Sequence, residues 1–297
     1  MKRIVLFLIT NLAIMFLLMA VFHVVCAFLG IAPGGAMGGD LYSLAVFSLI
    51  FGMAGGVISL LLSKTIAKWS VGAQVIDGTE GEAERWLVDT VRSLAERANV
   101  KMPEVAIYKG AANAFATGAF RNHALVAVST DIMAQMTREE LRAVLGHEMS
   151  HMANGDMVTM TLLQGVLNAC VIFLSRVVAF MAANATSGGK GNRRGSSNGI
   201  YYLVYYVMQI MLGLAASLVV YWYSRRREYA ADAGSANLLG TPSSMIAALR
   251  RLGNLQPGIL PDSIKAMGIA GKHASLFATH PSLEDRIAAL ERLQRGI

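Results

Sequence analysis

The sequence predicts an α-helical integral membrane protein, with about four transmembrane or hairpin helices and an α+β domain on the cytoplasmic side. Composition is the first reason, because 55% of the 297 residues are hydrophobic, 15% are charged and the mean hydropathy is +0.49. A soluble domain averages about 45–50% apolar and about 25% charged residues. The second reason is that four long apolar runs alternate with segments whose patterns are typical of soluble helices and strands.

The first two apolar runs, residues 4–29 and 41–62, are expected to form a two-helix membrane anchor over residues 1–63. Each run is long enough to cross a bilayer, which takes about 20 residues, and the first exceeds the ~7–15 apolar residues of a signal peptide. Residues 31–40 form a glycine-rich connecting loop without lysine or arginine. The basic residues flank the outer ends of the pair and place both ends in the cytoplasm: Lys2, Arg3, Lys64 and Lys68.

The third and fourth runs are predicted to form a membrane hairpin over residues 157–223. Tyrosine and tryptophan at both ends of the fourth run are typical of the aromatic belts at two membrane interfaces. The connecting loop, residues 187–199, carries Lys190, Arg193 and Arg194, which disagrees with a position outside the cell membrane. Either the loop is translocated despite its charge, or the hairpin is partly interfacial and does not fully cross.

The remaining segments, residues 64–156 and 224–297, are expected to form the two parts of one soluble domain. Residues 82–99 have helical periodicity, whereas residues 105–108 and 124–128 are short β-rich runs. The first part therefore predicts a small sheet followed by a helix, and the second part is expected to be mainly helical.

Charge and cysteine content narrow the function classes. The formal net charge of +7 fits contact with anionic lipid headgroups. A nucleic-acid partner is not expected, because no basic stripe is interleaved with aromatic residues. Cys26 and Cys170 lie inside apolar runs and form neither a disulfide framework nor a CxxC metal pattern.

A His-Glu-x-x-His pattern, starting at His147, is the main chemical signal. On a helix, His147 and His151 are one turn apart on the same face, a spacing that suits two vertices of a tetrahedral zinc site. Glu148 lies about 100° round the helix and can act on a water molecule as a general base. The alternative without a metal is a core helix in which other groups provide the hydrogen-bond partners of the two histidines.

Signals for the two ends of this helix are present in the sequence. Thr137 with Glu140 predicts a capping box at the start, and Asn154-Gly155 predicts the end.

A catalytic zinc takes three protein ligands and keeps one position open for water. None of the other four histidines, at positions 23, 123, 273 and 280, follows soon after the second. Glu228 and Asp232 are the best candidates, because at i and i+4 one can bind the metal while the other supports a ligand imidazole. An ordinary solvated helix has the same spacing, and in it Glu228 would simply form ion pairs with the neighbouring arginines. Spacing alone therefore leaves both the metal-binding and the solvated-helix interpretations open.

The combination of motifs resembles the HtpX-type membrane zinc metalloproteases, which are relatives of the CAAX-prenyl endopeptidases and, more distantly, of the thermolysin-like gluzincins. The resemblance covers nearly the whole chain and rests on four apolar runs in this order together with His147-Glu148-x-x-His151, Asn154-Gly155-Asp156 and Glu228-x-x-x-Asp232.

This resemblance implies a zincin-like metalloprotease domain that binds one Zn²⁺ per chain. It implies Glu228 as the third ligand, Glu148 as the base, and Asp232 as the support of a histidine ligand, His147. It further implies that Asn113 and Ala114 line the substrate cleft.

The donor to the developing oxyanion is not chosen by the sequence. His280 and Arg286 are similar to a late family motif near the active site, and either of them or Tyr229 could serve. Residues 113–118 fit a plain turn, or a strand that offers its backbone to an extended peptide.

The function implied is a zinc-dependent endopeptidase in a bacterial inner membrane, acting on polypeptides such as misfolded or damaged membrane proteins. One rival is a non-proteolytic membrane scaffold or transporter with a structural zinc site, although transporters place polar groups at mid-membrane. A second rival is a dedicated processing peptidase with one substrate. The oligomeric state is not predicted.

Overall fold

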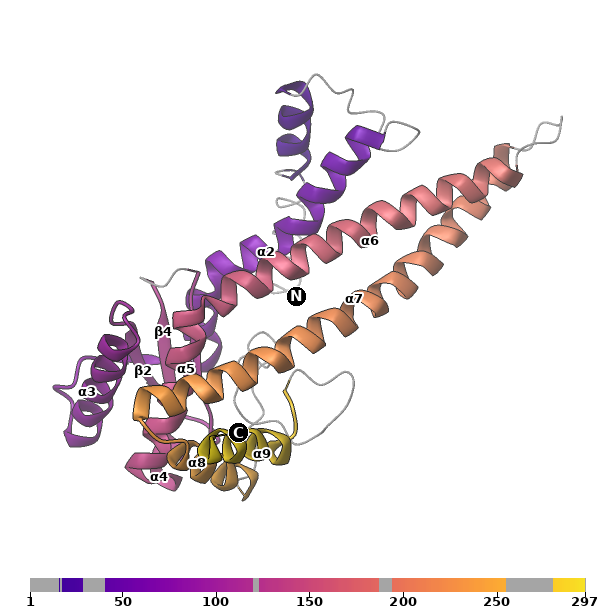
Figure 1. Cartoon of the computed structure of the whole chain (residues 1–297). Coiled ribbons are helices and arrows are strands. Elements are labelled where there is room, and N and C mark those ends of the chain that lie inside the picture. Colours follow the sequence, from indigo (N-terminus) through magenta and orange to yellow (C-terminus); the bar gives the residue numbers. More distant parts are fainter. Residues whose placement is uncertain are drawn as a thin grey trace. The chain divides into compact units, whose positions relative to one another are not determined.

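The computed structural model describes residue 16 and residues 18–28, 41–119, 123–186, 194–254 and 280–296. The chain divides into a helical unit, residues 1–58 and 161–217, and an α+β unit, residues 59–160 and 218–297. The boundaries between the two units fall inside three long helices, α2 (Leu41–Val71), α6 (Asp156–Thr186) and α7 (Arg194–Leu239) (Figure 1). The four domain segments expected from the sequence stay a prediction.

Within the described residues, α2, α6 and α7 are each long and apolar enough to cross a membrane. In the first predicted span, residues 18–28 form a shorter apolar helix. The rest of that span, apart from Phe16, and the loop expected at residues 31–40 lie outside the described residues. The predicted helical membrane architecture is confirmed.

The predicted loop over residues 187–199 is wrong at its C-terminal end, because α7 already begins at Arg194. Extending an existing helix costs far less than starting one, so the helix of the apolar run continues through the glycine and serine residues before it. Residues 187–193 lie outside the described residues. At its other end α7 runs through the arginine cluster to Leu239 without a break, so one helix joins the fourth apolar run to Glu228 and Asp232.

In the helical unit, α2 and α6 approach each other closely. A Cβ atom at Gly52 would lie 2.4 Å from the backbone nitrogen of Ala169, so this contact requires glycine. The guanidinium of Arg176 on α6 lies 4.2 Å from the ring centroid of Phe47 on α2, a cation–π distance.

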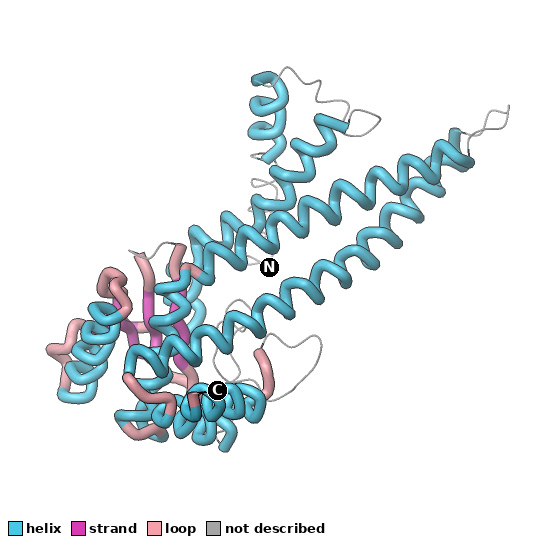
Figure 2. Tube along the Cα trace, viewed as in Figure 1, coloured by secondary structure: helices cyan, strands magenta, loops and turns pink. Residues whose placement is uncertain are grey.

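The α+β unit contains a four-stranded sheet of β1 (Gln74–Ile76), β2 (Glu104–Tyr108), β3 (Ala114–Thr117) and β4 (Leu125–Ser129). The order is β1-β2-β4-β3, with β2 and β4 parallel and the other two pairs antiparallel. The strands are the magenta segments in Figure 2. The two β-rich runs are confirmed as β2 and β4. The segment that fitted either a turn or a strand contains β3, which lies at one edge of the sheet.

Helices cover both faces of this sheet. On one face, Val105, Val126 and Val128 belong to a core shared with α3 (Glu82–Arg97), α5 (Arg138–Asn154) and α8 (Ser243–Asn254). α4 (Thr130–Gln135) contributes Ile132 to the same core, and α9 (Leu283–Arg295) contributes Leu290. In Figure 1, α8 and α9 lie side by side, and the contacts between them are extensive.

The other face of the sheet packs against the C-terminal end of α2. Ala106, Phe115 and Ala127 form a buried cluster with Ala67 of that helix. Side chains alternate between faces along a strand, so the three valines point to one face of the sheet and Ala106, Phe115 and Ala127 point to the other. The end of an apolar, membrane-type helix is thus a layer of the α+β unit.

Candidate metal centre

Helix α5 carries the His-Glu-x-x-His pattern, and both of its predicted ends are confirmed. The Thr137 hydroxyl accepts a hydrogen bond from the Glu140 backbone N–H, and the Glu140 carboxylate accepts one from the Thr137 N–H. Gly155 ends the helix with φ at 69°, a left-handed conformation that favours glycine. The histidines therefore lie on regular helix, held near its C-terminal end.

Small residues let α7 cross α5 at close range. A Cβ atom at Gly234 would lie 2.5 Å from Ser150 Oγ, and one at Gly146 would lie 2.8 Å from Ser235 Oγ. The Ser235 hydroxyl donates a hydrogen bond of 2.7 Å to the Ala143 carbonyl across the crossing. This contact places the acidic face of α7 against the histidine face of α5.

His147, His151 and Glu228 come together at the crossing with their metal-binding atoms facing one another. The two Nε2 atoms are 3.1 Å apart, and they lie 3.5 Å and 3.3 Å from the oxygens of Glu228. Ligand atoms around a tetrahedral zinc with bonds of about 2.0–2.2 Å are separated by ~3.3–3.6 Å. One atom from each residue can therefore bind a single ion, and all three side chains are buried.

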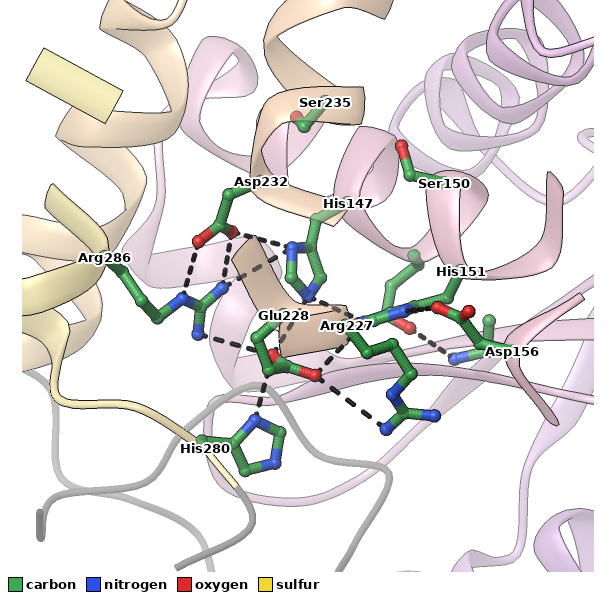
Figure 3. A network of polar contacts seen from close by, with 12 residues as sticks. His147, Ser150, His151, Asp156, Arg227, Glu228, Asp232, Ser235, His280 and Arg286 are labelled. Carbon is green, nitrogen blue, oxygen red and sulfur yellow. Dashed lines mark hydrogen bonds and ion pairs between the residues drawn. The ribbon is translucent and has the colours of Figure 1, made fainter. Parts of the chain in front are cut away.

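Two further carboxylates contact the imidazoles at Nδ1, the ring nitrogen opposite the metal-binding Nε2 (Figure 3). Asp232 Oδ1 lies 2.9 Å from His147 Nδ1, and Asp156 Oδ2 lies 2.6 Å from His151 Nδ1. A carboxylate at Nδ1 favours the tautomer that leaves Nε2 free to bind a metal. The structure places Asp232 beside His147, the ligand that the resemblance implied it would support, and places beside His151 a second carboxylate, Asp156, for which the sequence pattern indicated no role.

Arg286 of α9 anchors Asp232. Its side chain is fully buried, and it donates hydrogen bonds of 2.6 Å and 2.8 Å to the two Asp232 oxygens. Burial tends to raise the pKa of Asp232, but the Arg286 guanidinium outweighs burial and lowers that pKa. Asp232 is thus held as a carboxylate next to His147.

Neighbouring charges set the pKa values within the cluster. Burial lowers the pKa of His147, but the carboxylates of Asp232 and Glu228 outweigh it and raise the pKa to about 9. Burial likewise raises the pKa of Glu228, yet the nearby imidazoles of His280, His147 and His151 hold it well below its usual range. A buried carboxylate that attracts protons onto two imidazoles is suited to a divalent cation, whose binding replaces those protons.

Glu148 lies on the same helix and faces the edge strand. Its Oε2 atom accepts a hydrogen bond of 2.7 Å from the backbone N–H of Ala116 on β3. The side chain is almost fully buried, and burial raises the pKa of its carboxyl. Sequence reasoning named Asn113 and Ala114 on this segment and missed Ala116, because register within a strand is invisible before pairing is known.

Among the residues that the structure describes, β3 pairs with a strand on one side only. Ser129 of β4 donates a hydrogen bond to the Asn113 carbonyl, so by antiparallel alternation Ala114 and Ala116 direct their backbone groups away from β4. Ala116 uses its N–H for Glu148, as that alternation requires. Asn113 and Ala114 are both buried at the start of the strand.

Of the predicted candidates for the oxyanion donor, His280 contacts the cluster directly, whereas Tyr229 is partly exposed on α7. His280 Nδ1 lies 2.9 Å from Glu228 Oε2, although its angle is unsuited to a hydrogen bond. Tyr229 follows Glu228 by about 100° round α7 and is 36% exposed. Within the described residues, Glu228 Oε2 and both ring nitrogens of His280 are buried without a hydrogen-bond partner. Such orphaned atoms fit a site completed by an ion and a ligand.

A small pocket lies beyond the end of β3 and beside His151. Its lining is mostly apolar and includes Ala119, Ala124, Met152, Met157 and Val158. It lies at the same end of β3 as Thr117 and Gly118, which also line it.

Comparison with known proteins adds a family to this geometry. Residues 82–294 match the family model described as peptidase family M48. The chain is 52% identical over 297 residues to "Protease HtpX homolog" of Janthinobacterium sp. (strain Marseille), covering 99% of this chain and 100% of that protein. It is 53% identical over 302 residues to the protein of that name from Bordetella pertussis, with complete coverage of both.

The fold is shared with solved structures, among them the crystal structure of S. mikatae Ste24p, which superimposes with a TM-score of 0.65 at 19% identity. The match covers 96% of this chain and 64% of that protein, so this chain spans less than two thirds of the length of Ste24p.

Proposed function

Because this chain belongs to peptidase family M48 and is a metalloprotease, we propose that it is a membrane-bound zinc endopeptidase whose metal centre is the His147–His151–Glu228 cluster. The observation that carries the proposal is the meeting of two α5 imidazoles with an α7 carboxylate at separations that suit one tetrahedral ion. Members of peptidase family M48 are zinc metalloproteases in general, and the nitrogen and oxygen donors of this cluster are ligand types that zinc accepts.

A bound zinc ion supplies Lewis-acid chemistry, in that it acidifies water to a pKa of about 7 and polarises a carbonyl group. The chain's own residues do the rest. Asp232 and Asp156 keep the two imidazoles in the metal-binding tautomer, and Arg286 keeps Asp232 ionised.

Glu148 is proposed as the general base. The Ala116 N–H holds one carboxylate oxygen, which leaves the other oxygen to take the proton of the attacking water. The same carboxyl then returns that proton to the nitrogen of the leaving amine. Burial, which raises the pKa of Glu148, strengthens its carboxylate as the base that takes the proton from water.

The edge strand β3 is proposed to bind the substrate backbone. The outward-facing groups of Ala114 and the Ala116 carbonyl can pair with an extended peptide that adds to the sheet. A peptide in that position passes the pocket beside His151, where the apolar lining favours a small apolar side chain.

The test of the chemistry is Glu148→Gln in detergent-purified protein. This variant is expected to retain zinc and to lose cleavage of an unfolded protein substrate by roughly 10²–10⁴-fold, the usual contribution of a positioned acid–base group. Glu139→Gln, an exposed glutamate on the first turn of the same helix, is the matched control and should leave both unchanged. Undiminished proteolysis by Glu148→Gln would refute the proposal.

We further propose a role in quality control of misfolded membrane proteins in a bacterial inner membrane, with the α+β unit in the cytoplasm. Three membrane-type helices in the same chain as the cluster, the flanking basic residues and the bacterial relatives support this role. Deletion of the protein should lengthen the half-life of a misfolded membrane protein, and wild type but not Glu148→Gln should restore it. A scaffold would be restored by both.

Two more measurements separate the remaining alternatives. A cysteine at the exposed Glu139 position should react with a membrane-impermeant maleimide only after the inner membrane is opened. A peptide-library cleavage profile distinguishes a broad protease from a processing peptidase with one substrate.

A further inference from the structure

Three consecutive arginines on α7, Arg225, Arg226 and Arg227, occupy different environments. Their sequence position just after an apolar run suggests only a membrane-flanking cluster of positive charge. Arg226 fits that description, since its side chain is exposed and its guanidinium lies 5.2 Å from the ring centroid of Trp222. Arg227 does not fit it, because its side chain is only 9% exposed and lies at the metal centre.

The Arg227 guanidinium is incompletely satisfied. Its Nη2 atom lies 3.8 Å from Glu228 Oε1, too far for a direct hydrogen bond. Its Nε atom is buried and has no hydrogen-bond partner among the residues that the structure describes. A buried charged donor without a partner costs folding free energy, so its presence here calls for a ligand that completes it.

Arg227 and Arg286 lie on opposite sides of Glu228 (Figure 3). Arg286 donates twice to Asp232, and its Nη2 atom lies 3.4 Å from His147 Nδ1, the ring nitrogen that faces away from the cluster. Its Nη1 atom lies 3.7 Å from Glu228 Oε2 and is likewise buried without a hydrogen-bond partner among the described residues. The Arg286 side chain is fully buried, however, whereas that of Arg227 is 9% exposed. Arg227 instead approaches Glu228 Oε1, the oxygen that lies 3.3 Å from His151 Nε2.

We propose that Arg227 is a catalytic residue that binds the carbonyl oxygen of the scissile peptide bond. The proposal rests on the proposed zinc endopeptidase function. As the water oxygen bonds to the carbonyl carbon, the π electron pair moves onto the carbonyl oxygen, and the guanidinium N–H groups of Arg227 bind the resulting negative charge. The carbonyl then reforms, the C–N bond breaks, and the amine leaves with the proton carried by Glu148.

The substrate oxygen also completes the hydrogen bonding of Arg227. A planar guanidinium has five N–H donors in a fixed fork. In Arg227 the Nε donor has no partner among the described residues, and Nη2 lies 3.8 Å from Glu228 Oε1, beyond hydrogen-bond distance. The charge of the transition state is larger than that of the ground-state carbonyl, so this contact strengthens during the reaction. Arg227 is thus expected to act on kcat more than on KM.

The experiment uses the full chain in detergent and compares Arg227→Gln and Arg227→Lys with the matched control Arg226→Gln. Zinc content, thermal unfolding, kcat, KM and the affinity for a phosphinic peptide, which imitates the tetrahedral transition state, are measured for each. Arg227→Gln should lower kcat by about 10²–10³-fold, the usual effect of losing one oxyanion donor. KM and zinc content should change by less than about threefold, because neither depends on the transition state.

The affinity for the phosphinic peptide should fall in Arg227→Gln by the same factor as kcat/KM, a relation that a purely structural role would not produce. Arg227→Lys keeps the charge and should recover part of kcat. Arg226→Gln should match the wild type in all of these measurements.

Three results would overturn the proposal. One is a kcat for Arg227→Gln within threefold of wild type. Another is a loss of zinc in proportion to activity in both Arg227 variants, which would make Arg227 a support of Glu228. The third is an unchanged affinity for the phosphinic peptide. An active Glu148→Gln would instead refute the endopeptidase function itself, so the two failures are distinguishable.

Discussion

The crossing of α5 and α7 predicts a specific effect of adding one methyl group at Gly234. A Cβ atom there would lie 2.5 Å from Ser150 Oγ and 2.8 Å from Ser150 Cβ, whereas ordinary contacts begin near 3.4 Å. Rotation of the serine hydroxyl can relieve the first contact but not the second. The second falls short by about 0.6 Å (3.4 minus 2.8), so α7 must move away from α5 by a similar distance.

This displacement reaches the metal centre because Glu228 is on the same helix, six residues before Gly234 and thus about 9 Å along the axis. Zinc sites tolerate errors of only about 0.2 Å in ligand distance. Gly234→Ala is therefore expected to weaken zinc binding by roughly 10–100-fold, the scale seen for disturbed ligand support. Overpacking of this kind also costs about 1–3 kcal/mol of stability.

The assay is zinc affinity by competition with a chelator, together with thermal unfolding in detergent. Gly213→Ala is the control on the same helix, because a Cβ atom at Gly213 meets nothing within 4 Å. Adding Ser150→Gly to Gly234→Ala removes both close contacts, since the Ser150 Cα is 4.0 Å away, and should restore zinc binding. If Gly234→Ala binds zinc as tightly as Gly213→Ala, the close crossing is not what positions Glu228.

Two other changes test the charges around the centre. Arg286→Met leaves the buried Asp232 carboxylate unpaired and should cost roughly 3–5 kcal/mol of unfolding free energy. Arg250→Met, which breaks the exposed pair with Glu291, should cost less than about 1 kcal/mol; equal costs in denaturant unfolding would contradict the role given to Arg286. Glu104 accepts hydrogen bonds from Lys64 and Lys68, which lower its pKa, so its stabilising contribution is present above its ordinary pKa of 4.5 and is lost as the pH falls below that value. Because the group is well exposed, Glu104→Gln should lower the free energy of unfolding by at most about 1 kcal/mol at pH 7. This difference should shrink steadily as the pH is lowered from 4.5 through the lowered folded-state pKa, and a difference that does not shrink would refute the assignment.

Elements whose signals lie within a few residues were readable from the sequence. The α5 helix is such a case, since Thr137, Glu140 and Gly155 define its ends and its period puts both histidines on one face. The β-rich runs of β2 and β4 were also recognisable, because strands buried on both faces are almost continuously apolar. The N-terminal end of α7 was misplaced because glycine and serine are read as loop formers, whereas an established helix extends through them.

Parts of the site that depend on distant segments were not readable in the same way. The i, i+4 spacing of Glu228 and Asp232 is shared by many solvated helices, and the resemblance to a family supplied what spacing could not. Asp156 and Ala116 carry no pattern of their own, and Arg227 looks the same in sequence as its exposed neighbour Arg226.

By itself, the sequence determined the membrane-type helices, the strands β2 and β4 and the helix that carries His147 and His151, because backbone hydrogen bonding and hydrophobic periodicity act between near neighbours. Only the tertiary structure decided that Glu228 meets those imidazoles, that Ala116 holds Glu148, and that Arg227 turns inward. The first two contacts join residues 32 to 81 positions apart, and the third distinguishes adjacent identical residues. All of them depend on how closely helices and strands pack. Packing at that range follows from the shape of both surfaces, as the glycines at the α5–α7 crossing demonstrate.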